Sequence, residues 1–234
     1  MLDLFHAYEQ VVSETRDLEH EPFFTQYHDA YRELNRIAMS TGELVEGSLF
    51  NDNAVSELPD VPVPHLRYRR RNFAKYMSTG RNLLEVGFNA GHSALLALTV
   101  NPSLIYTGID IGKHRYTRLC YDFLKKELGS RIHLYIGDSR NMLPRTESGK
   151  FDRFHIDGGH TPEVGHADLA SVMKGAPINS IILFDDAAAD HVVSLISFYV
   201  LTGYLSKEPL PAFWELGVRG EASDQALLRV CKKL

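Results

Sequence analysis

From residue 81 onward, short apolar runs alternate with longer segments in which apolar residues recur every three or four positions. Short apolar runs are typical of strands buried on both faces of a sheet, and the helical spacing between them predicts connecting helices. Strands that alternate with helices in this way favour an α/β fold with a parallel sheet. The expected strands are 83–86, 105–110, 132–136, 151–156 and 180–184, and the expected helices are 93–99, 115–128, 160–174 and 190–204.

The chain before residue 81 follows a different pattern. Residues 1–39 have helical spacing broken at Pro22, which predicts two helices, and residues 40–64 are rich in glycine, asparagine and proline, which predicts a long loop. A loop of this length usually acts as a lid or contacts a partner. We therefore expect N-terminal helices and a loop over 1–64, serving as a lid or an oligomer contact, and a main domain over 65–234.

The main domain is expected to open with a helix over 65–76 that carries a run of basic residues. We interpret this run as a solvated helix face, which implies exposed side chains; the alternative is an anion-binding site. The four residues are Arg67, Arg69, Arg70 and Arg71.

Composition adds limits to this picture. Apolar residues make up 44% of the 234 residues, enough for a hydrophobic core, and the net charge of −5 gives no general attraction to nucleic acid or to an anionic membrane. The longest apolar stretch, 192–201, is too short to span a bilayer. Because Cys120 and Cys231 lie far apart and no basic and apolar leader opens the chain, we expect a cytoplasmic protein.

The turn after the first expected strand is the most informative stretch of the chain. It has the sequence Glu85-Val86-Gly87-Phe88-Asn89-Ala90-Gly91, and a helix is expected to start at His92 or Ser93. Glycines at such a turn let a ligand approach the backbone, and the helix N-terminus offers free N–H groups. The pyrophosphate fingerprint G-x-G-x-x-G is not met, because Asn89 replaces its middle glycine. A carboxylate at Glu85 would also repel a pyrophosphate, whereas it would attract a cation.

Each of the five expected strands ends in a carboxylate, on what would be one edge of the sheet. In open α/β sheets this carboxyl edge is where ligands bind. Asp110 follows Gly87 at about the 20-residue spacing at which an acid meets ribose hydroxyls in Rossmann-like folds; the alternative is a cap for the helix at Arg115. Capping is the alternative role for two further acids of the set. The set is Glu85, Asp110, Asp138, Asp157 and Asp185, of which Asp138 and Asp157 are those two.

The last two of these strands predict a metal site. They should be neighbours about 4.8 Å apart, so acids just beyond their ends can reach one ion. Asp157, Asp185 and Asp186 would supply three oxygen ligands, which favours Mg²⁺ over zinc, with Ca²⁺ or Mn²⁺ as alternatives. Because adjacent strand residues point in opposite directions, Asp185 and Asp186 converge only if the strand has ended; otherwise one of them caps the helix at Asp190.

The pattern E-x-G-x-x-x-G over 85–91 resembles motif I of class I methyltransferases, which use S-adenosylmethionine (SAM). The acid after the fourth strand and the acid pair after the fifth resemble the metal-dependent small-molecule O-methyltransferases, both the catechol and caffeoyl-CoA type and the macrolide-sugar type. The segments 85–93 and 155–160 look most like the bacterial branch that includes the sugar-modifying enzymes. The resemblance spans residues 81–230.

This resemblance implies a fold and a cofactor site. The fold would be a Rossmann-like, doubly wound and mainly parallel seven-stranded sheet, closed by an antiparallel hairpin from 212–216 and 226–230, with extra N-terminal helices. The implied cofactors are SAM and Mg²⁺ or another divalent cation. The expected SAM-binding residues are Glu85, Gly87, Asn89, Gly91 and Ser93 at the loop and the methionine end, Asp110 at the ribose, and Asp138 and Ser139 at the adenine.

The implied reaction is methyl transfer from SAM to a hydroxyl of a small polyhydroxylated molecule, sugar-like or catechol-like. A divalent ion lowers the pKa of a bound hydroxyl, and a nearby base removes its proton. His160 stands three residues after Asp157, where catechol-type relatives carry a catalytic lysine and some sugar-type relatives a histidine, so we name His160 and Asp157 as catalytic residues. His155 is expected in the core or supporting a ligand, and His166 and Asp168 at the surface.

Two other functions stay open at this point. A nicotinamide-dependent oxidoreductase would use a similar sheet, but Glu85 and Asn89 count against it, and a non-catalytic SAM-fold partner protein would not need the intact strand-end acids. Methylation of nucleic acid is not expected, because the N/D-P-P-Y/F motif is absent and the net charge is negative. The expected partners are a small-molecule substrate and further copies of the chain, because relatives often assemble through such N-terminal helices; no membrane partner is expected.

Overall fold

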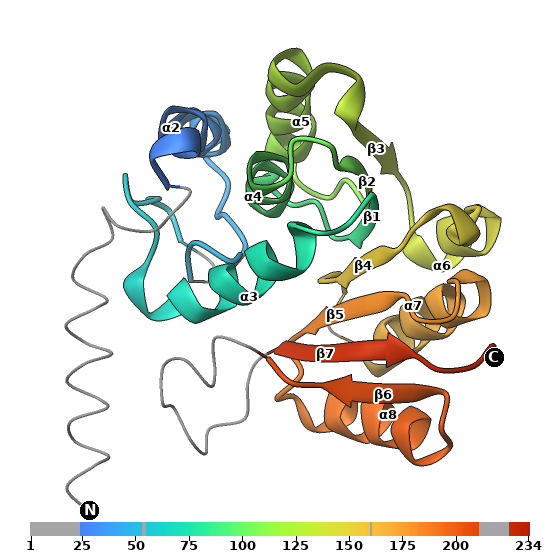
Figure 1. Ribbon diagram of the computed structural model, residues 1–234. Coiled ribbons are helices and arrows are strands. Elements are labelled where there is room, and N and C mark those ends of the chain that lie inside the picture. Colours follow the sequence, from blue (N-terminus) through green and yellow to red (C-terminus); the bar gives the residue numbers. More distant parts are fainter. Residues whose placement is uncertain (1–23, 53–54, 160, 211–224) are drawn as a thin grey trace, which may run out of the picture.

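A seven-stranded sheet forms the centre of the protein. The computed structural model describes residues 24–52, 55–159, 161–210 and 225–234. The strand order is β3-β2-β1-β4-β5-β7-β6, with β7 antiparallel to both of its neighbours and all other pairs parallel (Figure 1). The order reverses between β1 and β4, which is where open α/β sheets form a ligand crevice. The strands are β1 (Asn82–Val86), β2 (Ile105–Asp110), β3 (Ile132–Ile136), β4 (Arg153–Ile156), β5 (Ile181–Asp185), β6 (Leu205–Glu208) and β7 (Gln225–Val230).

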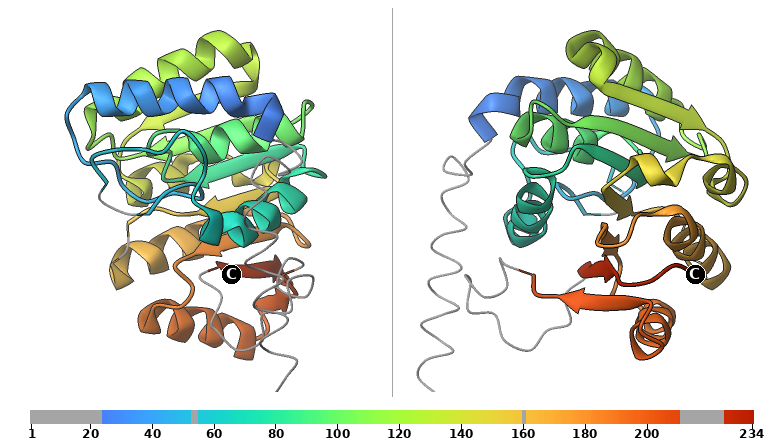
Figure 2. Two further views of the ribbon diagram at one scale, coloured as in Figure 1. Left: turned by 90° about the vertical axis from the view of Figure 1, so that its left-hand side faces the viewer. Right: turned by 45° about the vertical axis from the view of Figure 1, so that its right-hand side comes forward.

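Helices cover both faces of the sheet (Figures 1 and 2). One hydrophobic core joins α2, α3, α4 and α5 to one face, and a second joins α7 and α8 to the other. Among the described residues, none of the helices is both long and apolar enough to cross a membrane. The helices are α2 (Phe24–Ser40), α3 (Arg67–Met77), α4 (His92–Val100), α5 (Arg115–Leu128), α6 (Ser139–Met142), α7 (Pro162–Gly175) and α8 (Asp190–Leu201), with short 3-10 turns η2 (Pro64–Leu66), η3 (Gly129–Arg131), η4 (Leu143–Arg145) and η5 (Ser148–Lys150).

The predicted α/β pattern is confirmed for all five parallel strands and the helices that connect them. The last helix ends at Leu201 rather than at residue 204, because Gly203 adopts a left-handed φ of 72° that ends the helical path. The predicted antiparallel pair of strands at the C-terminal end of the sheet is confirmed, but the strand that pairs with β7 is Leu205–Glu208 and not 212–216, because β7 lies between Leu205–Glu208 and β5. The expected strand over 212–216 lies outside the described residues.

The N-terminal part packs against the main domain. Tyr31 and Leu34 of α2 are fully buried in the same core as Leu124 of α5. The loop over 41–63 contains one isolated strand bridge among its described residues, between Val45 and Val55. The first predicted helix lies outside the described residues, and the division at residue 64 stays a prediction.

The interpretation of the arginine run as a solvated face is wrong. Arg70 is fully buried, and Arg67, Arg69 and Arg71 are half-buried. Arg70 donates from Nη1 to the carbonyl oxygens of Leu49 and Val63, both at 3.0 Å, so it holds the 41–63 loop against α3. The reason is position: Arg70 shares a helical stripe with buried apolar residues, namely Phe73, Ala74 and Met77.

Candidate active site

The loop between β1 and α4 has a backbone that only its particular residues allow. Gly87, Asn89 and Gly91 have positive φ angles of 94°, 52° and 80°, a region open to glycine and tolerated by asparagine. A Cβ on Gly87 would lie 2.0 Å from the carbonyl oxygen of Asp157, and one on Gly91 would lie 2.6 Å from the Phe88 ring. The loop therefore closes tightly against the end of β4, and α4 begins at residue 92 as predicted.

Asp110 holds this loop in shape. Its Oδ2 accepts hydrogen bonds from the backbone N–H groups of Phe88 and Asn89, at 2.9 and 2.8 Å. Its Oδ1 accepts from the N–H of Gly112 at 2.7 Å. The alternative role as a cap of α5 is wrong, because the N-cap residue is His114. A carboxylate has about four acceptor positions, so Asp110 can hold the loop and still accept ribose hydroxyls; the ribose contact stays a prediction.

Asn89 joins the cofactor loop to the N-terminal part. Its Nδ2 donates to the carbonyl oxygens of Glu46 and Gly47, at 3.2 and 3.1 Å, and its Oδ1 accepts from the Tyr116 hydroxyl at 2.8 Å. The middle position of the motif is thus an asparagine because its amide anchors the 41–52 segment beside the loop. Nothing in the sequence pattern indicated this contact.

The start of α4 is buried. Ser93 is 8% exposed, and His92 is packed among aromatic rings, with Nε2 at 2.7 Å from Oδ1 of Asn35. Burial lowers the pKa of His92 to about 4, so the ring is neutral and Nε2 donates to the amide oxygen. The expected contact of Ser93 with the methionine end of SAM stays a prediction.

Asp138 and Ser139 lie at the end of β3, at the start of α6. The alternative role of Asp138 as a helix cap is confirmed, because its side chain accepts from the N–H of Arg140 at 2.9 Å. The hydrogen bond from the Arg140 side chain also holds the pKa of Asp138 below its usual range. A contact with adenine is compatible with this capping role and stays a prediction for both residues.

Asp168 contradicts the expectation that it lies at the surface. It is fully buried on α7, on the same helical stripe as Gly165 and Val172, whereas His166 is exposed as predicted and lies 3.2 Å from the Tyr199 hydroxyl. The Ser139 side chain interacts with this carboxylate and lowers its pKa, but the effect of burial is larger. Burial raises the pKa of Asp168 to about 6. The helical period of α7 could have revealed this position.

Buried polar side chains form a continuous row across the carboxyl edge of the sheet. The Tyr106 hydroxyl donates to Glu85, whose other oxygen lies 2.5 Å from Nδ1 of His155. Nε2 of His155 lies 3.1 Å from Oδ2 of Asp185, and Gln225 is paired with Asp185 in the β5–β7 register. Each is at most 2% exposed. The polar row consists of Tyr106, Glu85, His155, Asp185 and Gln225, with Asn72 of α3 donating to Gln225 at 3.4 Å.

Contacts within and beside the polar row shift the pKa values of His155 and Asp185. Burial alone would lower the pKa of His155, but the hydrogen bonds to Asp185 and Glu85 outweigh it and raise this pKa well above its usual value. Burial would raise the pKa of Asp185, but Arg69 and His155 outweigh it and lower this pKa. His155 is thus a core residue that supports Asp185, as expected. The prediction that Glu85 contacts SAM is not tested, although both of its oxygens already have donors.

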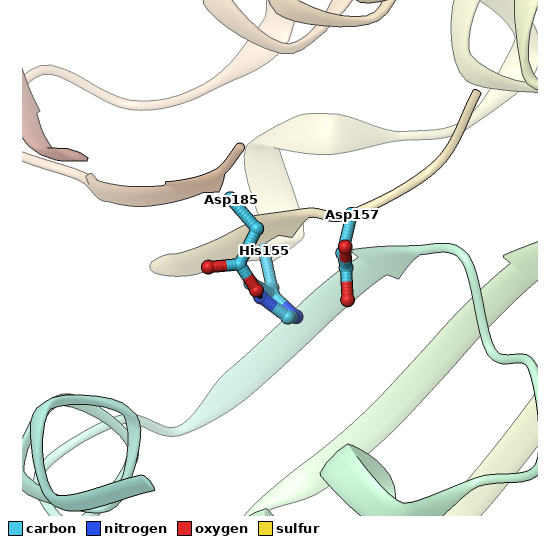
Figure 3. A group of neighbouring side chains, drawn as sticks. All are labelled: His155, Asp157 and Asp185. Atoms are coloured by element: carbon cyan, nitrogen blue, oxygen red, sulfur yellow. Dashed lines mark hydrogen bonds and ion pairs between the residues drawn. The ribbon is translucent and has the colours of Figure 1, made fainter. Parts of the chain in front are cut away.

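Two of the three predicted metal ligands, Asp157 and Asp185, lie together at this edge beside His155 (Figure 3). Single ligand atoms of His155, Asp157 and Asp185 lie within 4.8 Å of one another. Asp185 ends β5 and Asp186 follows with a left-handed φ of 55°, so the strand has ended, as convergence of the acid pair requires. The N-cap residue of α8 is Ala189, whose side chain makes no capping hydrogen bond, so the capping alternative for Asp185 or Asp186 is not supported.

The charge of this group fits a divalent cation. Removal from water raises the pKa of Asp157, and the nearby charges of Asp185 and Asp186 raise it further. A bound cation would relieve this repulsion, and carboxylate oxygens are the ligands that Mg²⁺ prefers. Asp157 and Asp185 therefore fit the ion by position and chemistry, whereas the role of Asp186 as a ligand stays a prediction.

One arginine of the basic run lies beside the acids. Arg69 of α3 lies 3.4 Å from Oδ1 of Asp185 with a side chain only 12% exposed, a contact that sequence reasoning missed when it assigned the arginines to solvent. His160, the predicted base, lies outside the described residues, so its place in the site stays a prediction.

The fold and part of the sequence are similar to those of methyltransferases. Residues 84–187 match the sequence model of a family described as "Methyltransferase domain". No curated protein matches the chain. The predicted methyltransferase domain is therefore confirmed over residues 84–187, and the dinucleotide-dependent alternative is not favoured.

Solved structures agree in fold over most of the chain. Cofactor-bound Rv0187 from MTB is 16% identical, with a TM-score of 0.61 and coverage of 88% of this chain and 91% of that one. The O-methyltransferase from Bacillus cereus in complex with SAH is 16% identical, with a TM-score of 0.57 and coverage of 87% and 91%. A putative caffeoyl-CoA O-methyltransferase from Staphylococcus aureus is 11% identical, with a TM-score of 0.54 and coverage of 71% and 83%. At these identities the likeness establishes the fold.

Proposed function

We propose that this protein is a divalent-cation-dependent O-methyltransferase that methylates a hydroxyl of a small polyhydroxylated molecule. The observation that carries the proposal is the contact of the glycine loop with the metal acids: Gly87 packs directly against the carbonyl oxygen of Asp157. The loop that would hold the cofactor and the acids that would hold the ion thus share one edge between β1, β4 and β5. The O-methyltransferase folds of Bacillus cereus and Staphylococcus aureus support the same chemistry.

The residues present divide the work of such a reaction. Asp157, Asp185 and Asp186 would hold the cation, which when bound lowers the pKa of a hydroxyl and fixes its orientation. Asp110 keeps the glycine loop in the shape that receives SAM, through the backbone hydrogen bonds described above. His160, proposed as the base, would take the proton from the acceptor hydroxyl as the methyl group is transferred.

We also propose a location and an assembly for the protein. Both cysteines are free, with Cys120 buried and Cys231 exposed, which supports a reducing, cytoplasmic location. We propose a homo-oligomer assembled through the N-terminal helices, with no nucleic-acid or membrane partner. Size-exclusion chromatography with light scattering tests the oligomer directly.

The function is tested by methyl transfer from radiolabelled SAM to a panel of catechols and sugar vicinal diols, with Mg²⁺ or with EDTA. We expect product with Mg²⁺ only, and loss of that product in Asp157→Asn while SAH binding persists. Asp122→Asn, at an exposed position of α5, is the matched control and should retain full turnover. As much product with EDTA as with Mg²⁺ would contradict the proposed cation dependence. As much product from Asp157→Asn as from the wild type would contradict the assignment of Asp157 as a ligand.

A further inference from the structure

The polar row spans the two halves of the site. Glu85 of β1 and His155 of β4 are paired in the parallel register, and His155 is paired with Leu183, two residues before Asp185 in β5. Side chains two apart on a strand share a face, so Glu85, His155 and Asp185 all lie on the α3 face of the sheet. The row therefore connects the strand that precedes the glycine loop with the strand that ends in the metal acids.

Local sequence makes room for this row. Gly108 of β2 is paired with Glu85, and a Cβ there would lie 2.9 Å from the Tyr106 hydroxyl. The glycine thus leaves space for the tyrosine to reach the carboxylate. On the other side, the Phe73 ring packs edge-on against His155, with centroids 5.0 Å apart at 68°, and fixes the plane of the imidazole.

His155 is the shared partner of the two carboxylates. Nδ1 faces Oε1 of Glu85 and Nε2 faces Oδ2 of Asp185; since carboxylates accept, both nitrogens donate. A ring that uses both nitrogens in this way has none left for a metal ion. Without the ring, Asp185 would retain Arg69 as a neighbouring cation, and Glu85 would retain Tyr106 as a donor, so each carboxylate would turn away from the other.

We propose that His155 is a positioning residue that fixes Glu85 and Asp185 relative to each other. The cofactor site and the divalent-cation site then both depend on the same buried ring, although the ring itself binds neither ligand. This inference rests on the proposed function, which puts the cation at Asp185, and on the predicted place of Glu85 at the methionine end of SAM. Hydrogen-bonded partners of metal ligands typically affect metal affinity by about 10-fold to 100-fold. His155 differs from such a partner in serving the cofactor end as well.

The experiment measures two affinities in the full chain, without turnover. SAH binding is measured by calorimetry and Mn²⁺ binding by electron paramagnetic resonance, for the wild type, His155→Phe, His155→Gln and Phe73→Leu. We expect His155→Phe, which keeps a ring but no donor, to weaken both affinities by about 10-fold or more. His155→Gln keeps one amide donor, which can hold only one of the two carboxylates. We therefore expect it to retain either the SAH affinity or the Mn²⁺ affinity of the wild type, but not both. Phe73→Leu removes the packing but leaves the hydrogen bonds, and should change both by less than about 2-fold.

A spectroscopic readout keeps the inference testable if His155→Phe does not fold. In nitrogen-15 spectra of the wild type, the His155 ring signals, assigned by their loss in His155→Gln, should shift on addition of SAH and separately on addition of Mg²⁺. Ring signals that move with neither ligand would overturn the inference, as would SAH and Mn²⁺ affinities in His155→Phe equal to those of the wild type. In both cases the wild type still binds its ligands, so the proposed function stands; a wild type that binds neither SAH nor Mn²⁺ removes both.

Discussion

Gly87 and Asp157 are in direct backbone contact: a Cβ added to Gly87 would stand 2.0 Å from the carbonyl oxygen of Asp157. Because backbone atoms on both sides would have to move, Gly87→Ala should both destabilise the fold, by about 2 kcal/mol or more, and abolish SAH binding. Gly42→Ala is the matched control, since Gly42 has a similar φ of 72° but open space around it. Thermal unfolding and calorimetry of the two variants check this. Equal effects in both variants would show that backbone strain matters and the contact does not.

Replacement of Asp110 should weaken cofactor binding because this carboxylate holds the glycine loop in shape. Asp110→Ala removes the acceptors of three backbone N–H groups, from Phe88, Asn89 and Gly112, so the glycine loop should lose its shape. We expect SAH affinity to fall at least about 10-fold, since each lost hydrogen bond to a charged group is worth about 1.5–3 kcal/mol. Asp122→Ala on α5 serves as the control. An unchanged dissociation constant in Asp110→Ala would show that the loop keeps its shape without this carboxylate.

Because Asp168 is buried, its contribution to the stability of the fold should fall as pH rises. Its folded-state pKa of about 6 is above the ordinary aspartate value, so the folded protein holds this proton more tightly than the unfolded chain does. Stability from this group is therefore complete below about pH 4 and is lost as pH rises to about 6, by about 2–3 kcal/mol. Asp168→Asn should raise the midpoint of thermal unfolding at pH 8 by about 5 °C and leave it unchanged at pH 4. A lower midpoint at pH 8 would mean that the carboxylate makes favourable contacts.

Because His92 is buried, its contribution to the stability of the fold should fall as pH falls, the opposite of Asp168. Its folded-state pKa of about 4 is below the ordinary histidine value of about 6.5, so the unfolded chain binds the proton more tightly. Stability is complete above about pH 6.5 and is lost as pH falls toward 4, by up to about 3 kcal/mol. Chemical denaturation at pH 7 and pH 5 should show a larger loss for the wild type than for His92→Gln. Parallel losses in the two proteins would contradict the burial of an uncharged ring.

The sequence allowed the fold to be predicted because strand and helix patterns are local. Apolar runs such as 105–110 mark buried strands, and the glycines at 87 and 91 mark a turn with positive φ. The strand Leu205–Glu208, which pairs with β7, was harder to predict from the sequence. It lies at the sheet edge, its positions alternate in burial, and it has no apolar run to indicate it. Its pairing with β7 depends on the whole sheet.

The site could be predicted only in part. Strand-end acids can be found from sequence, because each follows a recognisable strand. The partners of those acids cannot, since Glu85 and His155 meet only through the order in which β1 and β4 are placed. The same limit applies to Arg69, which a charge count assigns to solvent and the packing of α3 brings to Asp185.

We propose that the glycine loop between β1 and α4 binds SAM, and calorimetric titration with SAH measures this binding without turnover. We predict one-site binding in the micromolar range, retained in EDTA and lost in Gly87→Ala. NADH titrated under the same conditions should give no signal. Absence of SAH binding in the folded wild-type protein, with or without Mg²⁺, would contradict the claim.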